Sequence, residues 1–250
     1  MKEDFYIYGR QPVYELLRSS HPVFRLICAL ELEEKYKKKI IPLAERRNIK
    51  PEYVPKAKIQ LYTGPVIHQG IAAKIEEYIY KDEKDIFYLL KGNKISIFVI
   101  LDQIQDPHNV GAIIRTAEII GDTAIILPEK GSAPINSTVA KTSSGAVFHA
   151  PIHHTNNLTG FLKRLKEKGI RIVAAIPGQK QIIYKTSLTA PLAFIFGSEG
   201  EGVRKNLQNY CDMKISIPQV GKVNSLNVSV TAAIVLFETL RQKNYNEERE

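Results

Sequence analysis

The second half of the chain alternates short apolar runs with helix-like segments, and this pattern limits the folds open to it. The run Ile95–Leu101 (ISIFVIL) is almost continuously apolar, which suits a strand buried on both faces of a parallel sheet. Similar runs follow at Ala124–Leu127, Ile170–Ala175, Leu192–Phe196 and Met213–Ile217. Helix-like segments lie between them, at Val110–Ile120, Ile135–Ser144, Asn157–Glu167, Val203–Asn209 and Leu226–Gln242. We therefore predict an α/β domain built from βαβ units on a parallel sheet.

The first part of the chain predicts a second, smaller α/β unit. Strand-like runs occur at Phe5–Tyr8, Phe24–Leu32, Ile49–Val54 and Ile71–Ile75. Helical spacing occurs at Val13–Leu17 and Leu32–Arg47, and Lys81–Asn93 ends at a Gly-Asn pair that suits a helix stop. We expect an N-terminal domain over residues 1–80, a linker over 81–94 and the parallel-sheet domain over 95–250.

Charge and cysteine content narrow the classes of partner and compartment. The chain of 250 residues has 35 basic and 26 acidic side chains, a net charge of +9, which favours a polyanion such as RNA. Both halves share the excess, so neither is a basic tail. The two cysteines, Cys28 and Cys211, lie in apolar surroundings and predict buried free thiols of an intracellular protein. With no signal peptide and no apolar stretch of membrane-spanning length, we expect a cytoplasmic protein without a membrane partner.

Ligands of a parallel sheet bind beyond the carboxyl ends of its strands, and three polar loops fall there. The first is Asp102–Ala117 (DQIQDPHNVGAIIRTA). Asn109 can cap the following helix, and Arg115 lies on its first turns, where a guanidinium can hold a phosphate or a ribose. The alternative is a capped helix with a surface arginine. His108 lacks partners at metal-ligand spacing, so we expect no metal.

The second loop is Phe196–Val203 (FGSEGEGV). Its three glycines allow the backbone to approach a ligand closely. It matches neither the P-loop nor the dinucleotide fingerprint, which argues against a nucleotide-binding regulator. Glu199 is either a turn residue or a group that holds a polar ligand.

The third loop lies within Ile215–Leu240, which opens as a strand, breaks at Pro218 and enters a long apolar helix at Ser225. Small polar groups at Ser225, Asn227 and Ser229 suit the start of a helix, where backbone N–H groups lack partners. The alternative is simply a capped core helix. Its buried stripe would be Leu226, Val230, Ala233, Ile234 and Phe237.

The segments DPHNVGAIIRTA, FGSEGEGV and ISIPQVGKVNSLNVSVTAAI resemble, in order, the three motifs of the SpoU (TrmH) family of RNA ribose 2′-O-methyltransferases, of the SPOUT class. The resemblance covers Ile95–Arg241, and KTSSGAVFHAPI (Lys141–Ile152) is similar to the family as well. The opening YGRQPVYELL is similar to the N-terminal RNA-binding extension of one branch. That branch methylates a guanosine of large-subunit (23S) ribosomal RNA.

The resemblance implies S-adenosylmethionine as methyl donor, bound in a deep C-terminal trefoil knot through backbone groups at Gly197, Ile217 and Leu226. Glycines and a helix start both offer free backbone donors, which agrees with this assignment. The resemblance also implies a homodimer that meets through the knotted domain, to which Leu226–Phe237 could contribute. The family's invariant polar positions are occupied by Asn109, Arg115, Glu199, Ser225 and Asn227.

The implied reaction is in-line attack of a ribose 2′-hydroxyl on the sulfonium methyl, which needs alignment and proton removal but no metal. The family proposal makes Arg115 the general base. A guanidinium is hard to deprotonate, so we assign Arg115 to fixing the ribose–phosphate. Asn109 and Glu199 then position Arg115 or the ribose, and Ser225 and Asn227 shape the cofactor and substrate edges.

RNA is the expected partner because only RNA carries the 2′-hydroxyl. The N-terminal unit is expected to bind it through basic side chains, namely Arg10, Arg18, Arg46, Arg47 and Lys35–Lys39. For Lys35–Lys39, a solvated helix face is the equal alternative. Transfer RNA is the alternative substrate. An assembly factor that binds RNA without catalysis is the alternative from a different class, and the five intact polar positions argue against it.

Overall fold

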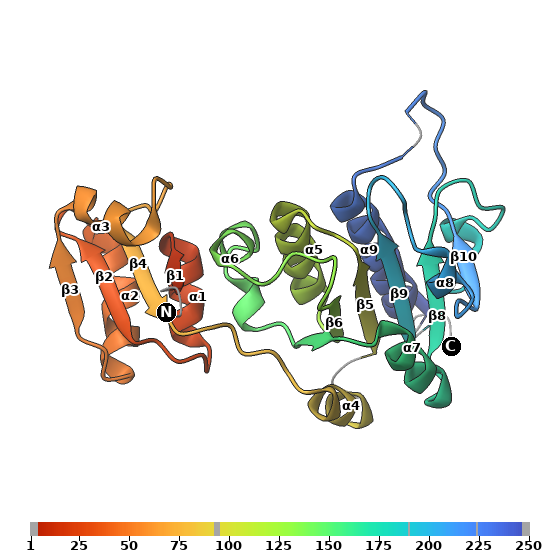
Figure 1. Ribbon diagram of the computed structural model, residues 1–250, viewed down its shortest axis with the longest axis horizontal. Helices are drawn as coiled ribbons and strands as arrows, with labels where there is room; N and C mark the ends of the chain where they lie inside the picture. Colours follow the sequence, from red (N-terminus) through yellow and green to blue (C-terminus); the bar gives the residue numbers. More distant parts are fainter. Residues whose placement is uncertain (1–4, 93–95, 190, 224, 247–250) are drawn as a thin grey trace. The chain divides into compact units, whose positions relative to one another are not determined.

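The structure, a computed structural model, describes residues 5–92, 96–189, 191–223 and 225–246. It divides into two compact units, drawn along the chain in Figure 1. The first unit contains the chain up to Ile79 together with Ile135–His149, and the second contains Tyr80–Pro134 and the chain from Ala150 onward. No helix within the described ranges is both long and apolar enough to cross a membrane.

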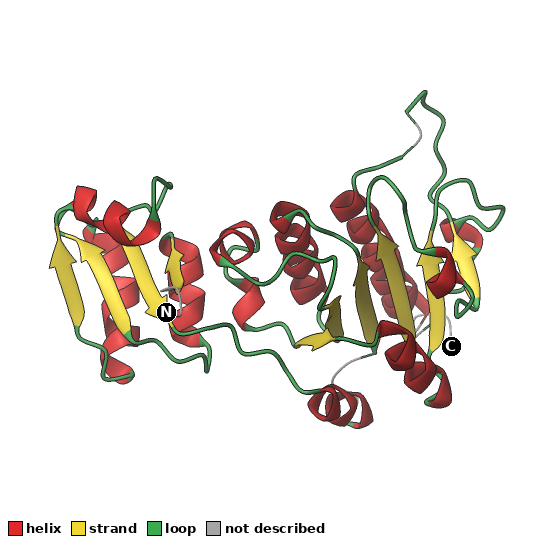
Figure 2. Cartoon of the chain, in the orientation of Figure 1, coloured by secondary structure: helices red, strands yellow, loops and turns green. Residues whose placement is uncertain are grey.

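The second unit is built on a six-stranded sheet with the order β10-β8-β9-β5-β6-β7 (Figure 2). Every neighbouring pair is parallel, so the predicted parallel α/β domain is confirmed. The strands are β5 (Ile97–Asp102), β6 (Thr123–Pro128), β7 (Ile152–Thr155), β8 (Arg171–Ala175), β9 (Leu192–Gly197) and β10 (Met213–Ile215). β7 was not predicted, because its sequence IHHT carries two histidines where the other strands are apolar.

Helices cover both faces of this sheet. The second unit contains α4 (Glu83–Lys91), α5 (Pro107–Ile120), α7 (Leu158–Glu167), η2 (Ile183–Lys185), α8 (Lys205–Gln208) and α9 (Val228–Asn246). On one face, Phe98, Ile100 and Ile195 form a core cluster with residues of α4, α7 and α8. Side chains alternate along a strand, so the buried Val99 and Phe194 belong to the other face. There α5 and α9 pack against each other and against β6 and β9.

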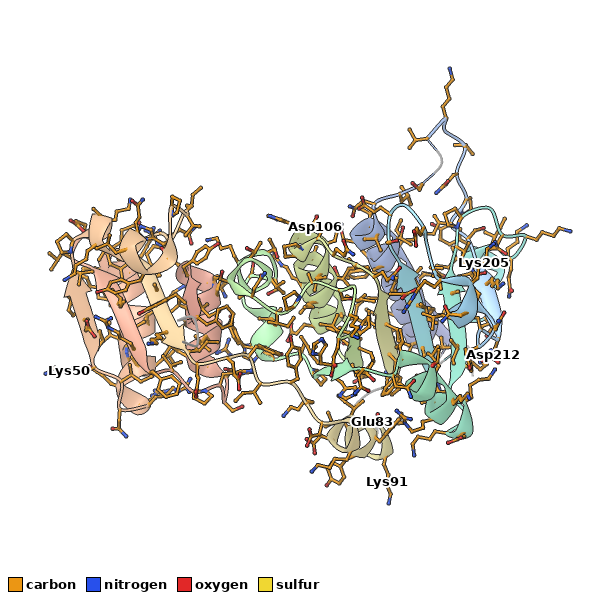
Figure 3. The ribbon with its side chains drawn as sticks, viewed as in Figure 1. Lys50, Glu83, Lys91, Asp106, Lys205 and Asp212 are labelled. Atoms are coloured by element: carbon orange, nitrogen blue, oxygen red, sulfur yellow. The ribbon has the colours of Figure 1, made fainter. Side chains whose placement is uncertain are left out.

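The segment expected as a linker is partly helical and packs on the second unit. In α4, Glu83 (labelled in Figure 3) forms a bidentate ion pair with Arg164 of α7. The Nη2 of Arg164 donates to Oε2 of Glu83 at 2.7 Å. Phe87 stacks on Phe161 of the same helix, with ring centroids 5.6 Å apart. The predicted domain boundaries at residues 80 and 95 stay a prediction.

The predicted start and buried face of α9 are wrong. The helix begins at Val228 rather than Ser225. Its buried apolar residues are Val228, Ala232, Val235 and Leu236, whereas Leu226, Val230 and Phe237 of the predicted stripe are 37%, 45% and 49% exposed. Ala233 and Ile234 are only half-buried. The run is apolar on all sides, so periodicity alone could not select the face that packs on α5.

The first unit contains a four-stranded sheet with the order β1-β4-β2-β3. β1 and β2 both pair antiparallel with β4, and β3 pairs parallel with β2. Its elements are β1 (Phe5–Tyr8), α1 (Arg10–Arg18), β2 (Arg25–Ala29), α2 (Glu34–Arg46), β3 (Pro51–Val54), α3 (Lys56–Thr63) and β4 (Ile71–Ile75). Of these, α3 was not predicted, because it has one buried residue and no clear apolar face.

A later segment completes this first unit. α6 (Ser137–Thr142) and η1 (Ala146–Phe148) pack against β1 and α1. The Tyr78 hydroxyl donates to the carbonyl of Val147 at 2.8 Å. Gly145 has a φ of +87°, and a Cβ there would stand 2.6 Å from that of Glu15. Residues 135–149 therefore pack with the first unit although they follow β5 and β6 in the chain.

Candidate active site

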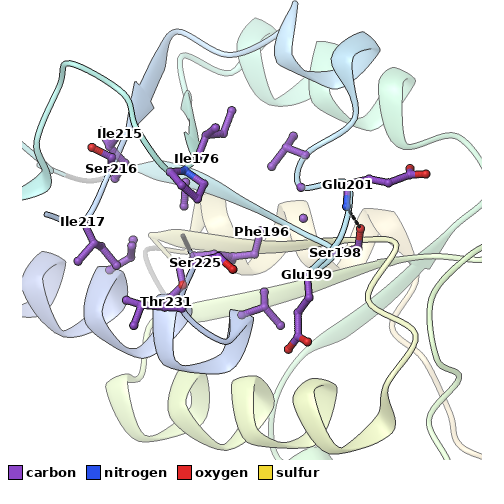
Figure 4. A pocket seen from close by; sticks show the side chains of 18 of the residues that line it. Ile176, Phe196, Ser198, Glu199, Glu201, Ile215, Ser216, Ile217, Ser225 and Thr231 are labelled. Atoms are coloured by element: carbon purple, nitrogen blue, oxygen red, sulfur yellow. Dashed lines mark hydrogen bonds between the residues drawn. The ribbon is translucent and has the colours of Figure 1, made fainter. Parts of the chain in front are cut away.

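A cavity of about 370 Å³ lies where three loops leave the carboxyl ends of β8, β9 and β10 (Figure 4). It lies at the edge of the sheet where strand polarity predicts a ligand site. Its walls combine apolar side chains, among them Ile176, Ile217 and Val235, with the backbone of Gly197–Gly202. The predicted cofactor positions Gly197, Ile217 and Leu226 all line it, together with Ser225.

The glycine loop after β9 folds back on itself. The N–H of Gly202 donates to the carbonyl of Ser198 at 2.9 Å, and Gly202 has a φ of +67°. A Cβ on Gly197 would stand 2.0 Å from the carbonyl carbon of Gly202 and 2.2 Å from the nitrogen of Val203. No side chain fits in that space, so this turn requires glycine at position 197.

A buried ion pair holds the base of the same loop. Asp102, at the end of β5, is completely buried. Its Oδ1 accepts from Nε of Arg204 at 2.7 Å, and its Oδ2 accepts from the backbone N–H of Arg204 at 3.0 Å. A buried carboxylate is tolerated when its partner and hydrogen bonds compensate for lost water. The sequence analysis missed this pair, since 102 positions separate the two residues and Asp102 ends an apolar run.

Three of the predicted polar residues meet in one hydrogen-bonded cluster. The Nδ2 of Asn109 donates to Oε1 of Glu199 at 3.0 Å. The Nδ2 of Asn227 lies 2.6 Å from the same oxygen and 2.9 Å from Oδ1 of Asn109. The Oδ1 of Asn227 also accepts from the N–H of Ser229, so it caps α9. The first turn of α5, the glycine loop and the segment before α9 thereby fix the Glu199 carboxylate in one orientation.

A second hollow of about 420 Å³ adjoins the first cavity at this cluster. Gln103 and Gln105 of the β5–α5 loop and Asn109 in the first turn of α5 line it, and it shares Ser198 and Glu199 with the cavity. Gln103 has a φ of +58°, a conformation that non-glycine residues rarely adopt and that often marks a functional loop. Glu199 therefore lines both of these adjoining spaces.

Arg115 is not brought to this cluster within the chain. It is exposed on α5 and lines neither hollow. It makes no hydrogen bond or ion pair with any other residue that the structure describes. Six positions after Asn109, it is about 9 Å further along the helix and turned about 240° around the axis. The expected cap is also different, since Asp106 rather than Asn109 caps α5, with Oδ1 accepting from the N–H of His108 at 2.8 Å.

In the first unit, Arg47, one of the basic side chains expected to bind RNA, is held by hydrogen bonds within the chain. Its guanidinium donates to the carbonyls of Leu16 and Ser19, at 3.0 and 3.3 Å, and to that of His21. Burial lowers the pKa of Arg47. The side chain is thus committed to closing the end of α1, whereas Arg46 is exposed.

Comparison with known proteins agrees with this arrangement. Residues 96–237 match the SpoU rRNA Methylase family, and residues 6–81 match a domain described as RNA 2'-O ribose methyltransferase substrate binding. A protein of Bacillus subtilis (strain 168), named for the TrmH family of tRNA/rRNA methyltransferases, is 35% identical over 96% of both chains. A Staphylococcus saprophyticus relative with the same family name is 36% identical over 97% of this chain and 98% of its own.

Solved structures show the same fold. The SpoU methyltransferase AviRb from Streptomyces viridochromogenes, in complex with AdoMet, superposes with a TM-score of 0.79 at 20% identity, covering 97% of this chain and 91% of its own. An AdoMet-bound rRNA methyltransferase from Sinorhizobium meliloti superposes with a TM-score of 0.78 at 24% identity, covering 96% and 87%. Two matched domains and relatives aligned over nearly the whole length lead to one assignment: the chain belongs to the SpoU family of RNA methyltransferases.

Proposed function

We propose that this chain transfers a methyl group from S-adenosylmethionine to a ribose 2′-hydroxyl of RNA. The supporting observation is the Asn109–Glu199–Asn227 cluster, which stands between two adjoining spaces. One space suits a cofactor and the other an acceptor nucleotide. The description of the N-terminal match, which names 2'-O ribose methylation, supports the choice of the ribose as acceptor.

The first cavity fits the proposed cofactor. Its volume of about 370 Å³ falls in the usual range for small-molecule sites. Apolar walls at Ile176 and Val235 and the free backbone of the glycine loop suit a nucleoside with polar edges. Backbone groups at Gly197, Ile217 and Leu226 would hold it, and Ser225 would line its edge. When bound, S-adenosylmethionine supplies a methyl group on a positively charged sulfur.

The chain's own residues then orient the acceptor. In this proposal the target ribose lies in the second hollow, where the fixed carboxylate of Glu199 and the amide of Asn109 position it. Alignment of this kind contributes much of the rate enhancement when the leaving group is already good. Arg115 holds the ribose–phosphate, and the hydroxyl proton leaves to a phosphate oxygen or water.

The position of Arg115 supports a homodimer as part of this proposal. Within one chain it is exposed and outside both hollows. The nearby surfaces of α5 and α9 carry exposed apolar side chains, with Ile119 at 63%, Val230 at 45% and Phe237 at 49%. A second copy would cover these side chains, and Arg115 could then reach a site that one chain leaves incomplete. We also propose that the C-terminal part of the chain contains the trefoil knot that the resemblance implies.

As substrate we propose a guanosine of 23S ribosomal RNA, modified in the cytoplasm. The support is the similarity of the N-terminal opening to that branch of the family. The relatives carry a combined tRNA/rRNA name, so transfer RNA is the second candidate.

The test uses tritiated S-adenosylmethionine with unmodified transcripts of 23S ribosomal RNA and of transfer RNA. We expect label at one ribose of the ribosomal RNA, lost in Arg115→Ala and strongly reduced in Glu199→Gln. Glu167→Gln, an exposed carboxylate at the end of α7, is the matched control and keeps the label. Label found only in transfer RNA would identify transfer RNA, rather than ribosomal RNA, as the substrate. No label, together with no cofactor binding by calorimetry, would leave an RNA-binding module without catalysis.

A further inference from the structure

The first unit contains a hollow of its own, of about 460 Å³, at the carboxyl end of β2. Its walls come from four places: Arg10 at the start of α1, the end of β2 with Glu31 and Leu32 after it, Lys56 and Gln60 on α3, and the loop that carries Ile67 and His68. None of these residues contributes to the active-site hollows. The hollow needs its own explanation.

A buried imidazole lines this hollow with one nitrogen uncommitted. His68 is only 3% exposed. Its Nδ1 accepts from the N–H of Gly70 at 3.2 Å, which places the proton of the neutral ring on Nε2. Burial, with help from the charge of Lys56, lowers the pKa of His68, so the ring is neutral at pH 7. Its Nε2–H has no hydrogen-bond partner among the residues that the structure describes, and it can serve as a donor in the hollow.

The loop around His68 is held in an uncommon conformation. Gln69 has a φ of +56° and Gly70 one of +81°. The carbonyl of Gln69 accepts from Nε of Arg10 at 3.2 Å. Its Oε1 accepts from the backbone N–H of Arg10 and from Nζ of Lys141, both at 3.0 Å. Several hydrogen bonds therefore fix a backbone that would otherwise be strained, and such fixed strain is typical of binding loops.

The rim of the hollow combines an apolar surface with positive charge. Ile67 is 81% exposed and offers an apolar surface at the edge of the hollow. Lys56 is exposed and forms no ion pair with another described residue. Arg10 stacks on Tyr36, 3.8 Å from the ring centroid, and pairs with Glu33. A ligand with a flat apolar face, hydrogen-bond acceptors and a negative group matches this set, and a nucleotide has all three.

We propose that this hollow receives one unstacked nucleobase of the substrate RNA. The base lies against Ile67 and accepts a hydrogen bond from Nε2 of His68, while its phosphate lies near Lys56. Single-stranded loops of RNA present such bases, because their edges are not occupied by pairing. The inference rests on the proposed function and deepens it by naming a contact through which the first unit selects RNA.

The first experiment measures the dissociation constant of the full chain for 23S ribosomal RNA fragments at fixed salt, by fluorescence anisotropy. Ile67→Ser should raise it about tenfold, equivalent to about 1.4 kcal/mol, because the apolar contact between the base and the side chain is lost. Lys56→Gln should weaken binding and reduce the salt dependence by about one phosphate contact. Phe24→Ser is the matched control. Phe24 is 61% exposed but precedes β2, at the end opposite the hollow, and its substitution should leave the constant unchanged.

Two further measurements decide the remaining outcomes. Removing a single base from the RNA, at the nucleotide that ultraviolet light crosslinks to the His68 peptide, should weaken binding as much as Ile67→Ser, with no additional loss when the two are combined. Wild-type affinity in Ile67→Ser, equal losses in Phe24→Ser, or no RNA binding by the wild-type chain would each overturn the proposal. Cofactor affinity and methyl transfer are measured in parallel. A chain that binds RNA through this hollow yet transfers no methyl group would refute the proposed function alone.

Discussion

The active-site cavity of the second unit and the hollow of the first unit are built from different parts of the chain. The cavity combines apolar side chains with the backbone of a glycine loop, whose base is held by the buried Asp102. The hollow is lined by side chains, several of them exposed, around a loop held by Arg10. A site that binds its ligand through main-chain groups loses affinity when a substitution changes the course of the main chain. A site that binds through side chains can change its ligand specificity by one substitution at a time. The two should therefore respond to substitution very differently.

The largest effect is expected for Gly197→Ala. The added Cβ would stand 2.0 Å from the carbonyl carbon of Gly202, so the loop must open and its backbone donors must move. We expect the affinity for S-adenosylmethionine, measured by calorimetry, to fall at least about a hundredfold, which is roughly 2.7 kcal/mol. The control is Gly221→Ala, where a Cβ meets nothing within 4 Å. Equal losses in both variants would show that the close approach at Gly197 is unimportant.

A smaller effect is expected when the ion pair between Asp102 and Arg204, at the base of the glycine loop, is weakened. Asp102→Asn keeps the shape but removes the charge that faces Arg204 at 2.7 Å. We expect about a tenfold loss of cofactor affinity and a decrease of about 2 kcal/mol in the free energy of unfolding, because the buried carboxylate loses its charge-assisted hydrogen bonds to Arg204, whose side chain is 33% exposed. Asp122→Asn is the control, since Asp122 is 45% exposed in its pair with Lys243 and exposed pairs contribute little. Unchanged cofactor affinity in Asp102→Asn would mean that the loop holds its shape unaided.

The sheet and the meeting of the three loops could be predicted because each depends on local pattern. Apolar runs such as Ile95–Leu101 identify buried parallel strands, and strand polarity then places the loops that follow them at one edge. Asn109, Glu199 and Asn227 do meet there. The order of the strands and the short strand β7 depend on long-range pairing, which no single segment encodes.

The errors share one cause, which is that tertiary contacts choose among local alternatives. In the first turns of α9, from Val228 to Phe237, apolar residues face every side, so packing on α5 decides that Val235 is buried and Phe237 is exposed. Arg47 looks like a surface cation in the sequence, yet carbonyls at the end of α1 surround it. Arg115 matches its motif but lies outside the cluster of its own chain, and no pattern within one chain could show what a second copy contributes.

Two neighbouring arginines of the first unit, Arg47 and Arg46, should differ in how their substitution affects stability. Arg47→Gln should lower the free energy of unfolding by about 2 kcal/mol, because hydrogen bonds from a charged group to buried carbonyls are lost. It should leave the RNA affinity of the folded chain unchanged. Arg46→Gln, an exposed neighbour on α2, should leave stability within about 0.5 kcal/mol. Denaturant unfolding and anisotropy separate the two effects, and weaker RNA binding by a stable Arg47→Gln would contradict the structural role.

The smallest effect concerns α9, whose first turns line the active-site cavity. Hydrogen bonds from Arg241 lower the pKa of Glu238, so the folded state holds this carboxylate ionised more strongly than the unfolded state does. The resulting stability is present above the ordinary glutamate pKa and is lost as the pH falls through the lowered value. Glu238→Gln should therefore be less stable than wild type by about 1 kcal/mol at pH 7, and the difference should close as the pH falls below about 4. Unfolding curves across this range test the sign, with Glu118→Gln as an exposed control on α5.

Because Glu238 lies three residues beyond Val235, the last residue of α9 that lines the cavity, cofactor affinity at pH 7 should stay unchanged. A parallel loss of affinity would show that the backbone-built site depends on the far end of α9 as well as on the loops around it.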